Sequence, residues 1–202
     1  MDRTCNLIGI QRLAAIYQRL LVIERFNTTP RHLNENIASH MYLVALLCVA
    51  LSEGKGVNVG KTLEMCLIHD SDESYSGDIV ANLKRFHPNV ARALSDASEE
   101  FLDIIIDDIP ISNRWRALWK EYKERVTPEA KLVKAADCVS QIISMAMELK
   151  LGNTFAKVAA CNAMFALREN TNDQDLILEC EEFLHLVGVD CTEQNCFEQW
   201  EM

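Results

Sequence analysis

Two histidines and two aspartates stand at positions where the helical pattern of the sequence favours apolar side chains. His40 lies early in the apolar segment ENIASHMYLVALL, and Asp137 lies among apolar neighbours in KLVKAADCVSQII. His69 and Asp70 end the apolar run that begins at Leu63. Burying such polar groups is unfavourable unless a partner compensates them, and a metal ion is one such partner.

Together the four residues form a mixed set of nitrogen and oxygen ligands. Two imidazoles and two carboxylates suit a divalent ion such as Mn, Co, Fe, Ni or Zn, with room for water or a phosphate oxygen. Taken singly, each has a plainer interpretation, because a lone helical histidine more often belongs to a core or a surface and a lone aspartate is usually solvated. Their spread over three predicted helices is what a metal site inside a helical bundle requires.

The elements that would position these residues are predicted to be helices almost throughout. Apolar residues recur at helical spacing from Leu7 to Ile23, and Asn34 is expected to cap a helix from about Glu35 to Leu51. The segment 71–82 is expected to be turn-like. Further helices are expected at about 61–69, 89–106 and 114–125. The start signal Thr127-Pro128 predicts a helix over about 128–152. Two more helices are expected, one after a cap at Asn153-Thr154 and one within the last thirty residues. The fold class is therefore all-α.

The length and composition favour one domain with a sizeable core. The chain has 202 residues, about half of them apolar. We expect residues 1–170 to form the domain body and 171–202 to form an acidic C-terminal helix and tail of the same domain. The stripe of Trp115, Trp119 and Tyr122 is interpreted as core or oligomer contact rather than as a platform for a base.

The formal net charge of −10 argues against binding to nucleic acid polymers or anionic membranes, which need Lys and Arg to meet phosphates. No apolar stretch reaches the roughly 20 residues of a membrane span. The chain contains eight cysteines, most of them inside apolar helical patterns and none in a CxxC pair. We interpret them as reduced thiols in the core of a cytoplasmic protein.

The order and spacing of these motifs resemble the H…HD…D signature of HD-domain metal-dependent phosphohydrolases. The finer pattern is similar to that of the YfbR-like bacterial 5′-deoxynucleotidases and related short phage deoxynucleoside triphosphate hydrolases. ENIASH resembles their E-N-x-x-E-H element, with Ser39 where an acid is usual, and HDSDESYSGD resembles their H-D-x-x-E-x-x-x-G-D element. TPEAKLVKAAD resembles the run before the last metal-binding aspartate, so the resemblance covers roughly residues 7–155.

The resemblance implies a role for each residue that matches a motif. The implied metal ligands are His40, His69, Asp70 and Asp137. Glu73 falls on the catalytic acid, next to the metal, where it would orient or deprotonate the attacking water. The plainer interpretation of Glu73 is a solvent-facing loop acid.

The resemblance also implies a set of substrate contacts. Arg25 and Lys84 fall on phosphate-binding cations, Phe26 on the aromatic position beside the base or sugar, and Asp78 on the position near the sugar. The plainer interpretations are surface cations and a turn residue. Val80 stands where the family usually has Pro, so the preference for a particular base is left open.

The function implied is that of a metal-dependent phosphohydrolase that cleaves the 5′-phosphate ester of deoxynucleotides. Monophosphates, triphosphates or both are possible substrates, with dATP among them, and Arg31 or Arg85 could supply charge for the outer phosphates. A homo-oligomer is implied too. The alternative is a catalytically silent HD module for nucleotide sensing or assembly, against which the intact ligand set and Glu73 argue.

Overall fold

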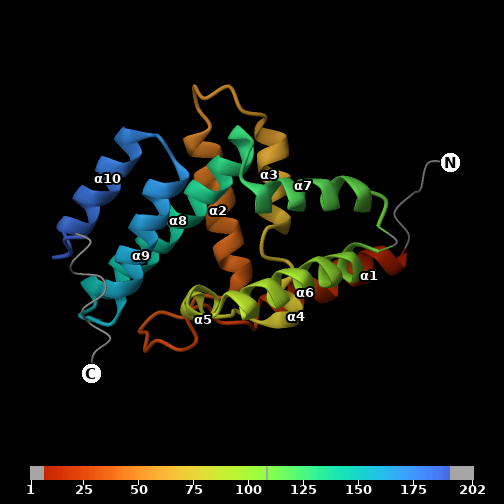
Figure 1. The fold of residues 1–202 in the computed structure, drawn as a ribbon, viewed down its shortest axis with the longest axis horizontal. Helices are drawn as coiled ribbons and strands as arrows, with labels where there is room; N and C mark the ends of the chain where they lie inside the picture. Colours follow the sequence, from red (N-terminus) through yellow and green to blue (C-terminus); the bar gives the residue numbers. More distant parts are fainter. Residues whose placement is uncertain (1–6, 108, 192–202) are drawn as a thin grey trace.

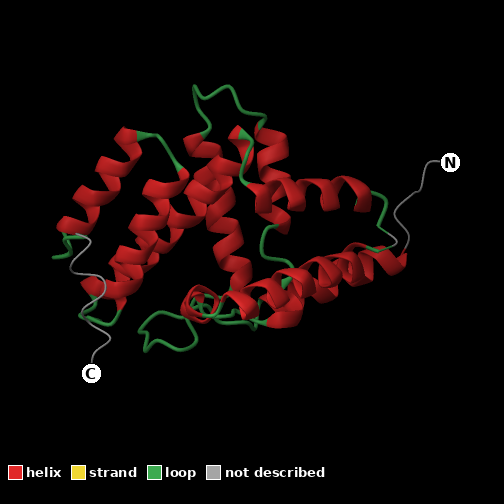
Figure 2. Cartoon of the chain, viewed as in Figure 1, coloured by secondary structure: helices red, strands yellow, loops and turns green. Residues whose placement is uncertain are grey.

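The computed structural model describes residues 7–107 and 109–191, and within them the chain is helical with one isolated β-bridge and no sheet. This confirms the all-α prediction (Figure 2). The helices are α1 (Leu7–Leu20), α2 (Ile37–Leu51), α3 (Val59–Ile68), α4 (Glu73–Ser76), α5 (Ala81–Phe86), α6 (Pro88–Ile106), α7 (Ser112–Glu124), α8 (Pro128–Lys150), α9 (Ala156–Asn170) and α10 (Gln174–His185).

Helices α2, α3 and α8 pack against one another at the centre of the molecule (Figure 1). Helix α9 runs beside α8, and α10 packs against both, while α7 covers α3 and α8. Helices α1, α4 and α6 lie together below this group in the view of Figure 1. The three segments that carry the histidines and aspartates of interest are thereby neighbours.

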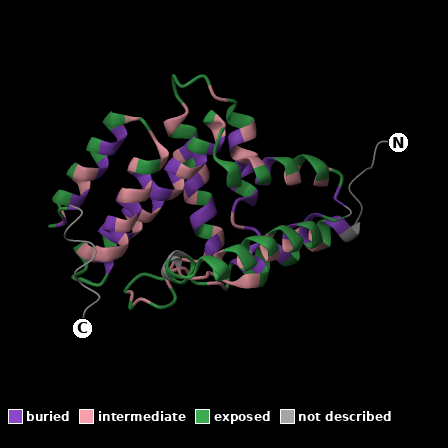
Figure 3. Cartoon of the chain, in the orientation of Figure 1, coloured by how far each residue is buried: buried purple, intermediate pink, exposed green. Residues whose placement is uncertain are grey.

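Two hydrophobic clusters form the core, and α8 belongs to both of them. The first joins α1, α2, α3, α6 and α7 to the start of α8, and the second joins the rest of α8 to α9 and α10. Figure 3 shows the buried residues on the inward sides of these helices. Ala136 belongs to the first cluster and Ala135 and Cys138 belong to the second, so the two clusters meet on α8 beside Asp137.

The expected start of the second helix and the end of the first need correction. Helix α1 ends at Leu20, and the chain then forms an antiparallel bridge between Glu24 and Asn36. The bridge keeps Asn36 extended, so α2 begins at Ile37 rather than near Glu35. The cap is Asn36, whose side chain accepts a hydrogen bond of 2.9 Å from the Ser39 nitrogen, and not Asn34.

Other boundaries shift for similar local reasons. Helix α3 begins two residues before the expected Lys61, because Asn58 caps it. The turn-like segment 71–82 contains α4 and the start of α5. Thr127 caps α8 as predicted, accepting a hydrogen bond of 3.2 Å from the Ala130 nitrogen.

The expected Asn153-Thr154 cap is wrong, because α9 begins at Ala156 and has no side-chain cap. The amide of Asn153 instead donates to Glu148 and to the Pro30 carbonyl, each at 2.7 Å. It therefore fastens the end of α8 to the loop before α2.

The aromatic stripe lies in the core as expected, since Trp119 and Tyr122 are buried. Six cysteines fall within the described residues and all are buried, while Cys5 and Cys196 lie outside them. None of the described helices is long and apolar enough to cross a membrane. Helix α10 packs against α8 and α9, and the expected tail 192–202 lies outside the described residues, so the division of the chain stays a prediction.

Candidate metal and substrate site

The four predicted ligands come together at the junction of α2, α3 and α8. Ligand atoms of His40, His69 and Asp137 all lie within 4.8 Å of one another. The Oδ2 atom of Asp70 lies 3.1 Å from His69 Nε2 and 3.5 Å from His40 Nε2. Asp137 Oδ1 lies 3.2 Å from His40 Nε2. The structure therefore brings two imidazole nitrogens and two carboxylates to one point.

The hydrogen bonds behind the two rings fix which nitrogen of each faces this point. His69 Nδ1 lies 3.0 Å from the Cys66 carbonyl oxygen, which can only accept, so Nδ1 carries the hydrogen. Ser140 Oγ donates to the Asp137 carbonyl at 2.8 Å and, with its single hydrogen used, accepts from His40 Nδ1 at 3.1 Å. In the neutral form, both rings therefore direct an Nε2 lone pair toward the carboxylates.

These two Nε2 atoms are buried and have no hydrogen-bond partner among the described residues. A buried polar atom without a partner is unfavourable and calls for an explanation. The nearby carboxylate oxygens lie at contact distance but outside hydrogen-bond geometry. A divalent cation held by the two nitrogens and the two carboxylates satisfies all four groups, so the residues fit a metal ion.

The charges of the cluster also favour a cation. Burial opposes protonation of His69, but Asp70 and then Asp137 outweigh it and raise the pKa of His69 to about 9. Burial opposes ionisation of Asp137, yet Lys134 and His40 hold the pKa of Asp137 well below its ordinary value. Because the carboxylates stay ionised, a metal ion and a proton compete for the same nitrogens.

Glu73 borders the cluster at the start of α4. The chain leaves α3 at His69 and turns through Asp70, which brings Glu73 back toward the same point. Its Oε2 atom is buried without a hydrogen-bond partner among the described residues, which contradicts the solvent-facing interpretation. Burial, then Asp70 and Asp78, raise the pKa of Glu73 well above its ordinary value, against the opposing effect of Arg25. A carboxyl group whose pKa is raised in this way holds a proton more readily than an exposed glutamate, which suits a role in proton transfer.

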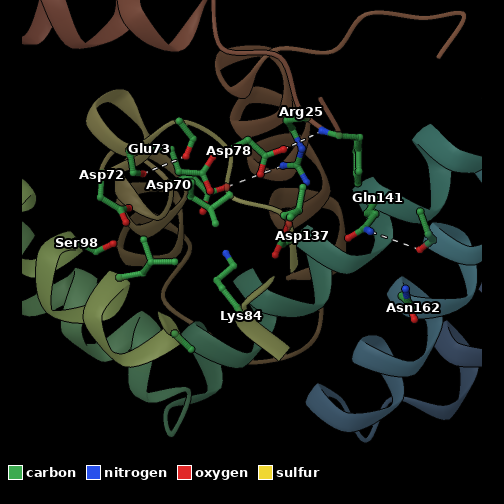
Figure 4. Close-up of a pocket in the computed structure, with 18 of the residues that line it drawn as sticks. Arg25, Asp70, Asp72, Glu73, Asp78, Lys84, Ser98, Asp137, Gln141 and Asn162 are labelled. Carbon is green, nitrogen blue, oxygen red and sulfur yellow. Dashed lines mark hydrogen bonds and ion pairs between the residues drawn. The ribbon is translucent and has the colours of Figure 1, made fainter. Parts of the chain in front are cut away.

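The Glu24–Asn36 bridge sets the position of Arg25. The Arg25 nitrogen donates to the Glu35 carbonyl at 2.8 Å, at the neck of the loop 25–35. Its side chain is only 11% exposed, with NH1 3.9 Å from Asp70 Oδ2 and Nε 3.8 Å from Glu35 Oε1. In Figure 4 its guanidinium points toward the acidic residues of the pocket. A cation therefore lies at the edge of the candidate metal centre.

Phe26 adopts a left-handed backbone conformation, with φ of 56°, which is unusual for a residue other than Gly. Asp78 stabilises it: its Oδ2 accepts a hydrogen bond of 2.8 Å from the Phe26 nitrogen, and its carbonyl accepts one of 3.1 Å from the Asn27 side chain. Gly77, at φ 73°, makes the turn that directs Asp78 there. Asp78 thus has a structural partner in addition to its expected place near the sugar.

Arg31 does not reach the outer part of the site, contrary to one expectation. Its Nε lies 3.4 Å from Glu148 Oε1 and its NH1 lies 3.5 Å from Glu35 Oε2, and the side chain is 8% exposed. Glu148 is fully buried and also accepts from the backbone nitrogens of His32 and Leu33. The Arg31 charge is therefore neutralised inside the protein. The Arg85 side chain lies outside what the structure describes.

A cavity of about 430 Å³ opens next to the metal cluster. The predicted residues that line it are Arg25, Phe26, Asp70, Glu73, Asp78, Lys84 and Asp137, together with Val80. Lys84 is exposed and makes no ion pair with any described residue. Figure 4 shows it pointing from α5 toward Asp137. The prediction that these residues share one site fits their placement, while the role of each stays a prediction.

Several lining residues were missed by the sequence analysis. Lys134 Nζ lies 2.7 Å from Asp137 Oδ2, and Lys123 and Arg125, at the end of α7, line the same cavity. Gln141 and Asn162 line it from α8 and α9. The helical spacing of Lys134 and Gln141 about Asp137, three and four residues away, could have revealed these two. The residues of α7 and α9 carry no such signal.

Comparison with known proteins places the chain in a family. The HD-domain family model matches residues 18–174. A 5′-deoxynucleotidase of Schizosaccharomyces pombe is 32% identical over 138 residues, which cover 61% of this chain and 67% of that protein. A 5′-deoxynucleotidase of Pasteurella multocida is 25% identical over 159 residues, covering 74% and 80% respectively. A 5′-deoxynucleotidase of Xenopus laevis is 28% identical over 109 residues, which cover 54% of this chain and 53% of that protein.

Solved structures share the fold. A predicted metal-dependent phosphohydrolase of Magnetospirillum magnetotacticum superposes with a TM-score of 0.66 at 19% identity, covering 93% of each chain. The HD phosphohydrolase of cyanophage S-2L, solved with dA and one catalytic Zn²⁺, superposes with a TM-score of 0.57 at 20% identity, covering 86% of this chain and 95% of that one.

Proposed function

The chain belongs to the HD-domain family, and we propose that it is a divalent-metal-dependent phosphohydrolase that cleaves the 5′-phosphate ester of deoxynucleotides and releases a deoxynucleoside. The observation that carries this proposal is the metal cluster. His40 and His69 direct unpartnered Nε2 atoms at Asp70 and Asp137, and Arg25 lies beside Asp70. A metal-ion site beside an arginine that can bind phosphate is the arrangement that phosphate ester hydrolysis needs.

We propose His40, His69, Asp70 and Asp137 as the metal ligands. Bound there, a divalent ion (Mn, Co, Zn, Ni or Fe) supplies positive charge that stabilises the phosphoryl oxygens and acidifies the attacking water. Ser140 and the Cys66 carbonyl keep the two rings oriented for this role.

The remaining steps fall to side chains around the cavity. Arg25 and Lys84 hold the phosphoryl group, with the guanidinium able to contact two oxygens at once. Glu73 takes the proton of the attacking water and relays it to the leaving 5′ oxygen, and its raised pKa suits this exchange. Phe26 and Asp78 line the part of the cavity that would take the sugar, next to Arg25.

The relatives support the choice of substrate. The fission yeast and Pasteurella proteins are named 5′-deoxynucleotidases, and the cyanophage enzyme was solved with dA. A triphosphate such as dATP is a further proposed substrate beside the monophosphate. Attack at the α-phosphorus breaks the same bond in both cases, and the cations Lys123, Arg125 and Lys134 line the cavity where β- and γ-phosphates could extend.

We also propose a cytoplasmic location and a homo-oligomer. The buried cysteines are typical of a reducing compartment. Tyr42 and Leu46, which are 68% and 50% exposed, lie four residues apart on the outer side of α2. Apolar side chains gathered on one helix face favour contact with a second subunit.

The test is a substrate screen of the purified chain, stripped of metal and reloaded with each divalent ion. We expect dAMP to give deoxyadenosine and phosphate, and dATP to give deoxyadenosine and intact triphosphate on chromatography. Accumulation of dADP and then dAMP from dATP would show attack at the terminal phosphate and contradict the placement of the α-phosphate at the metal. Stoichiometric bound metal with no turnover of any nucleotide would favour the silent-module alternative.

A further inference from the structure

Two rows of side chains, one on α8 and one on α9, line the same cavity. Members of each row are three or four residues apart, so each row occupies one face of its helix. Helices α8 and α9 pack along each other (Figure 1), and because both rows line the same cavity, they form one wall of it. The α8 row is Lys134, Asp137 and Gln141, and the α9 row, with the residue that precedes the helix, is Phe155, Val158, Ala159 and Asn162.

The wall has a direction, because its chemistry changes along α8. Asp137 belongs to the metal cluster, and Lys134 lies one turn before it, with its Nζ 2.7 Å from Asp137 Oδ2. Gln141 lies one turn after it, which is about 6 Å along the helix axis. A nucleotide whose phosphate lies at Asp137 and Lys134 therefore extends past Gln141. Figure 4 shows Gln141 and Asn162 on the opposite side of the pocket from Asp72 and Glu73.

The amides of Gln141 and Asn162 have hydrogen-bonding capacity that the described residues leave unused. Gln141 donates from Nε2 to the Ala159 carbonyl at 3.4 Å, and its Oε1 accepts no hydrogen bond from a described residue. Asn162 is partly buried, and its side chain makes no hydrogen bond with the described residues. The amides of Asn153 and Asn170, by contrast, are bonded within the protein. Unused amides on a cavity wall are suited to a polar ligand.

The side chains beside these amides are apolar and include an exposed aromatic ring. Phe155 is 66% exposed at the edge of the cavity, and Val158 and Ala159 lie between it and Asn162 on the same face. Such a surface suits the flat face of a nucleobase, which stacks on aromatic rings whatever its identity. The wall therefore combines a surface for the face of a base with amides for its edge.

We propose that Gln141 and Asn162 hydrogen-bond the edge of the substrate base, and that this contact makes the site favour nucleotides over sugar phosphates that lack a base. This inference rests on the proposed deoxynucleotide substrate. Only one of the two hydrogens on Gln141 Nε2 is bonded to Ala159, so the side chain offers the ligand a second N–H and the acceptor Oε1. Asn162 offers both a donor and an acceptor, as in the paired contacts that amides make with adenine.

The test compares kcat/KM of the metal-loaded enzyme for dAMP, dCMP, dTMP and 2-deoxyribose 5-phosphate, which has no base. We expect wild type to favour the three nucleotides over 2-deoxyribose 5-phosphate by about tenfold, the order expected for one paired base contact. In Asn162→Leu and Gln141→Leu, the preference for each nucleotide over 2-deoxyribose 5-phosphate should fall several-fold. The matched control is Asn170→Leu, because Asn170 lies on α9 outside this cavity and bonds to the Ala166 carbonyl.

Two results would overturn the inference. One is a wild-type enzyme that treats dAMP and 2-deoxyribose 5-phosphate alike. The other is an equal loss on all substrates in the variants, deoxyribose 5-phosphate included, which would assign the amides to the sugar or to the scaffold. Calorimetric binding of dAMP and 2-deoxyribose 5-phosphate to the metal-loaded protein gives the same comparison without turnover. The base inference can therefore fail while the proposed hydrolysis holds, and it can be tested even if hydrolysis is absent.

Discussion

The carboxylate of Asp78 accepts a hydrogen bond of 2.8 Å from the backbone nitrogen of Phe26, a residue 52 positions earlier in the chain. This bond joins the turn after α4 to the loop before α2. It also holds Phe26 in its left-handed conformation, directly after Arg25. This bond therefore joins the turn that carries Asp78 to the segment that carries Arg25, the proposed phosphate-binding residue.

Asp78→Ala should impair substrate binding more than chemistry. It leaves the Phe26 N–H without its acceptor, a change that costs about 1–3 kcal/mol when the group is buried. We expect KM for dAMP to rise with kcat largely kept, and any preference for dAMP over AMP to weaken. Asp78→Asn should lie between wild type and Asp78→Ala, because its amide oxygen can still accept. Steady-state kinetics on both nucleotides measures this, and a fall in kcat alone would argue against the link.

Asp137→Ala should remove bound metal and turnover together. The variant takes one carboxylate from the cluster and leaves Lys134 without its 2.7 Å partner. Elemental analysis after dialysis gives the metal content, and phosphate release gives the rate. The control is Asp103→Ala, which removes an exposed carboxylate on α6 paired with Arg116 and should change neither. Stoichiometric metal at an unchanged rate in Asp137→Ala would refute the four-ligand assignment.

Glu73→Gln should separate proton transfer from binding. The substitution keeps the shape of the side chain and removes its ability to take a proton. We expect metal and substrate binding to persist while kcat falls by about 10²–10⁴, the usual contribution of a general acid or base. Glu64→Gln on α3, where the carboxylate pairs with Arg114 at 2.7 Å, serves as control. A loss of less than about tenfold would demote Glu73 to a structural role.

Glu148 should make the stability of the protein depend on pH in acid. Although burial opposes ionisation, hydrogen bonds from Asn153, His32 and Leu33 and the charge of Arg31 lower the pKa of Glu148 from 4.5 to about 2. Because the folded-state pKa is the lower one, the stabilisation is complete above pH 4.5 and is lost as the pH falls toward 2. It amounts to roughly 3 kcal/mol at neutral pH.

The matched comparison for Glu148 is Glu148→Gln in the metal-free protein. Urea unfolding should show a large loss of stability at pH 7 and a smaller difference between the two proteins near pH 3.5. A difference that is the same at both pH values would mean that packing, and not the carboxylate charge, accounts for the effect. Retained stability at pH 7 would show that the 31–33 loop is held by other contacts.

Most of the fold and the metal cluster could be predicted because they depend on local patterns. Helical periodicity predicted the helices, and a polar residue inside an apolar run, as at His40 or Asp137, indicated the candidate metal site. Helix boundaries near Glu35 and Asn153 were wrong because contacts with distant residues decide them. Asn36 is held by a bridge to Glu24, and Asn153 is drawn to Glu148 and Pro30.

The substrate side of the site was harder to predict for the same reason. Arg31 carries the right charge, but the carboxylates of Glu148 and Glu35 neutralise it, and only the folded structure reveals this. Asn162 and Phe155 lie at ordinary positions for a helix face and its cap. They line the cavity only because α9 packs beside the face of α8 that carries Asp137.

The two imidazoles of the proposed metal site differ in how easily a mutation could misdirect them. His69 is oriented by a main-chain carbonyl, which every amino acid at position 66 would supply. His40 is oriented by the hydroxyl of Ser140, which a single substitution can delete. Substitutions around the site can therefore misorient His40, while the orientation of His69 is maintained by the backbone. Position 140 does not line the cavity, so a small change there could adjust metal affinity during evolution or by design.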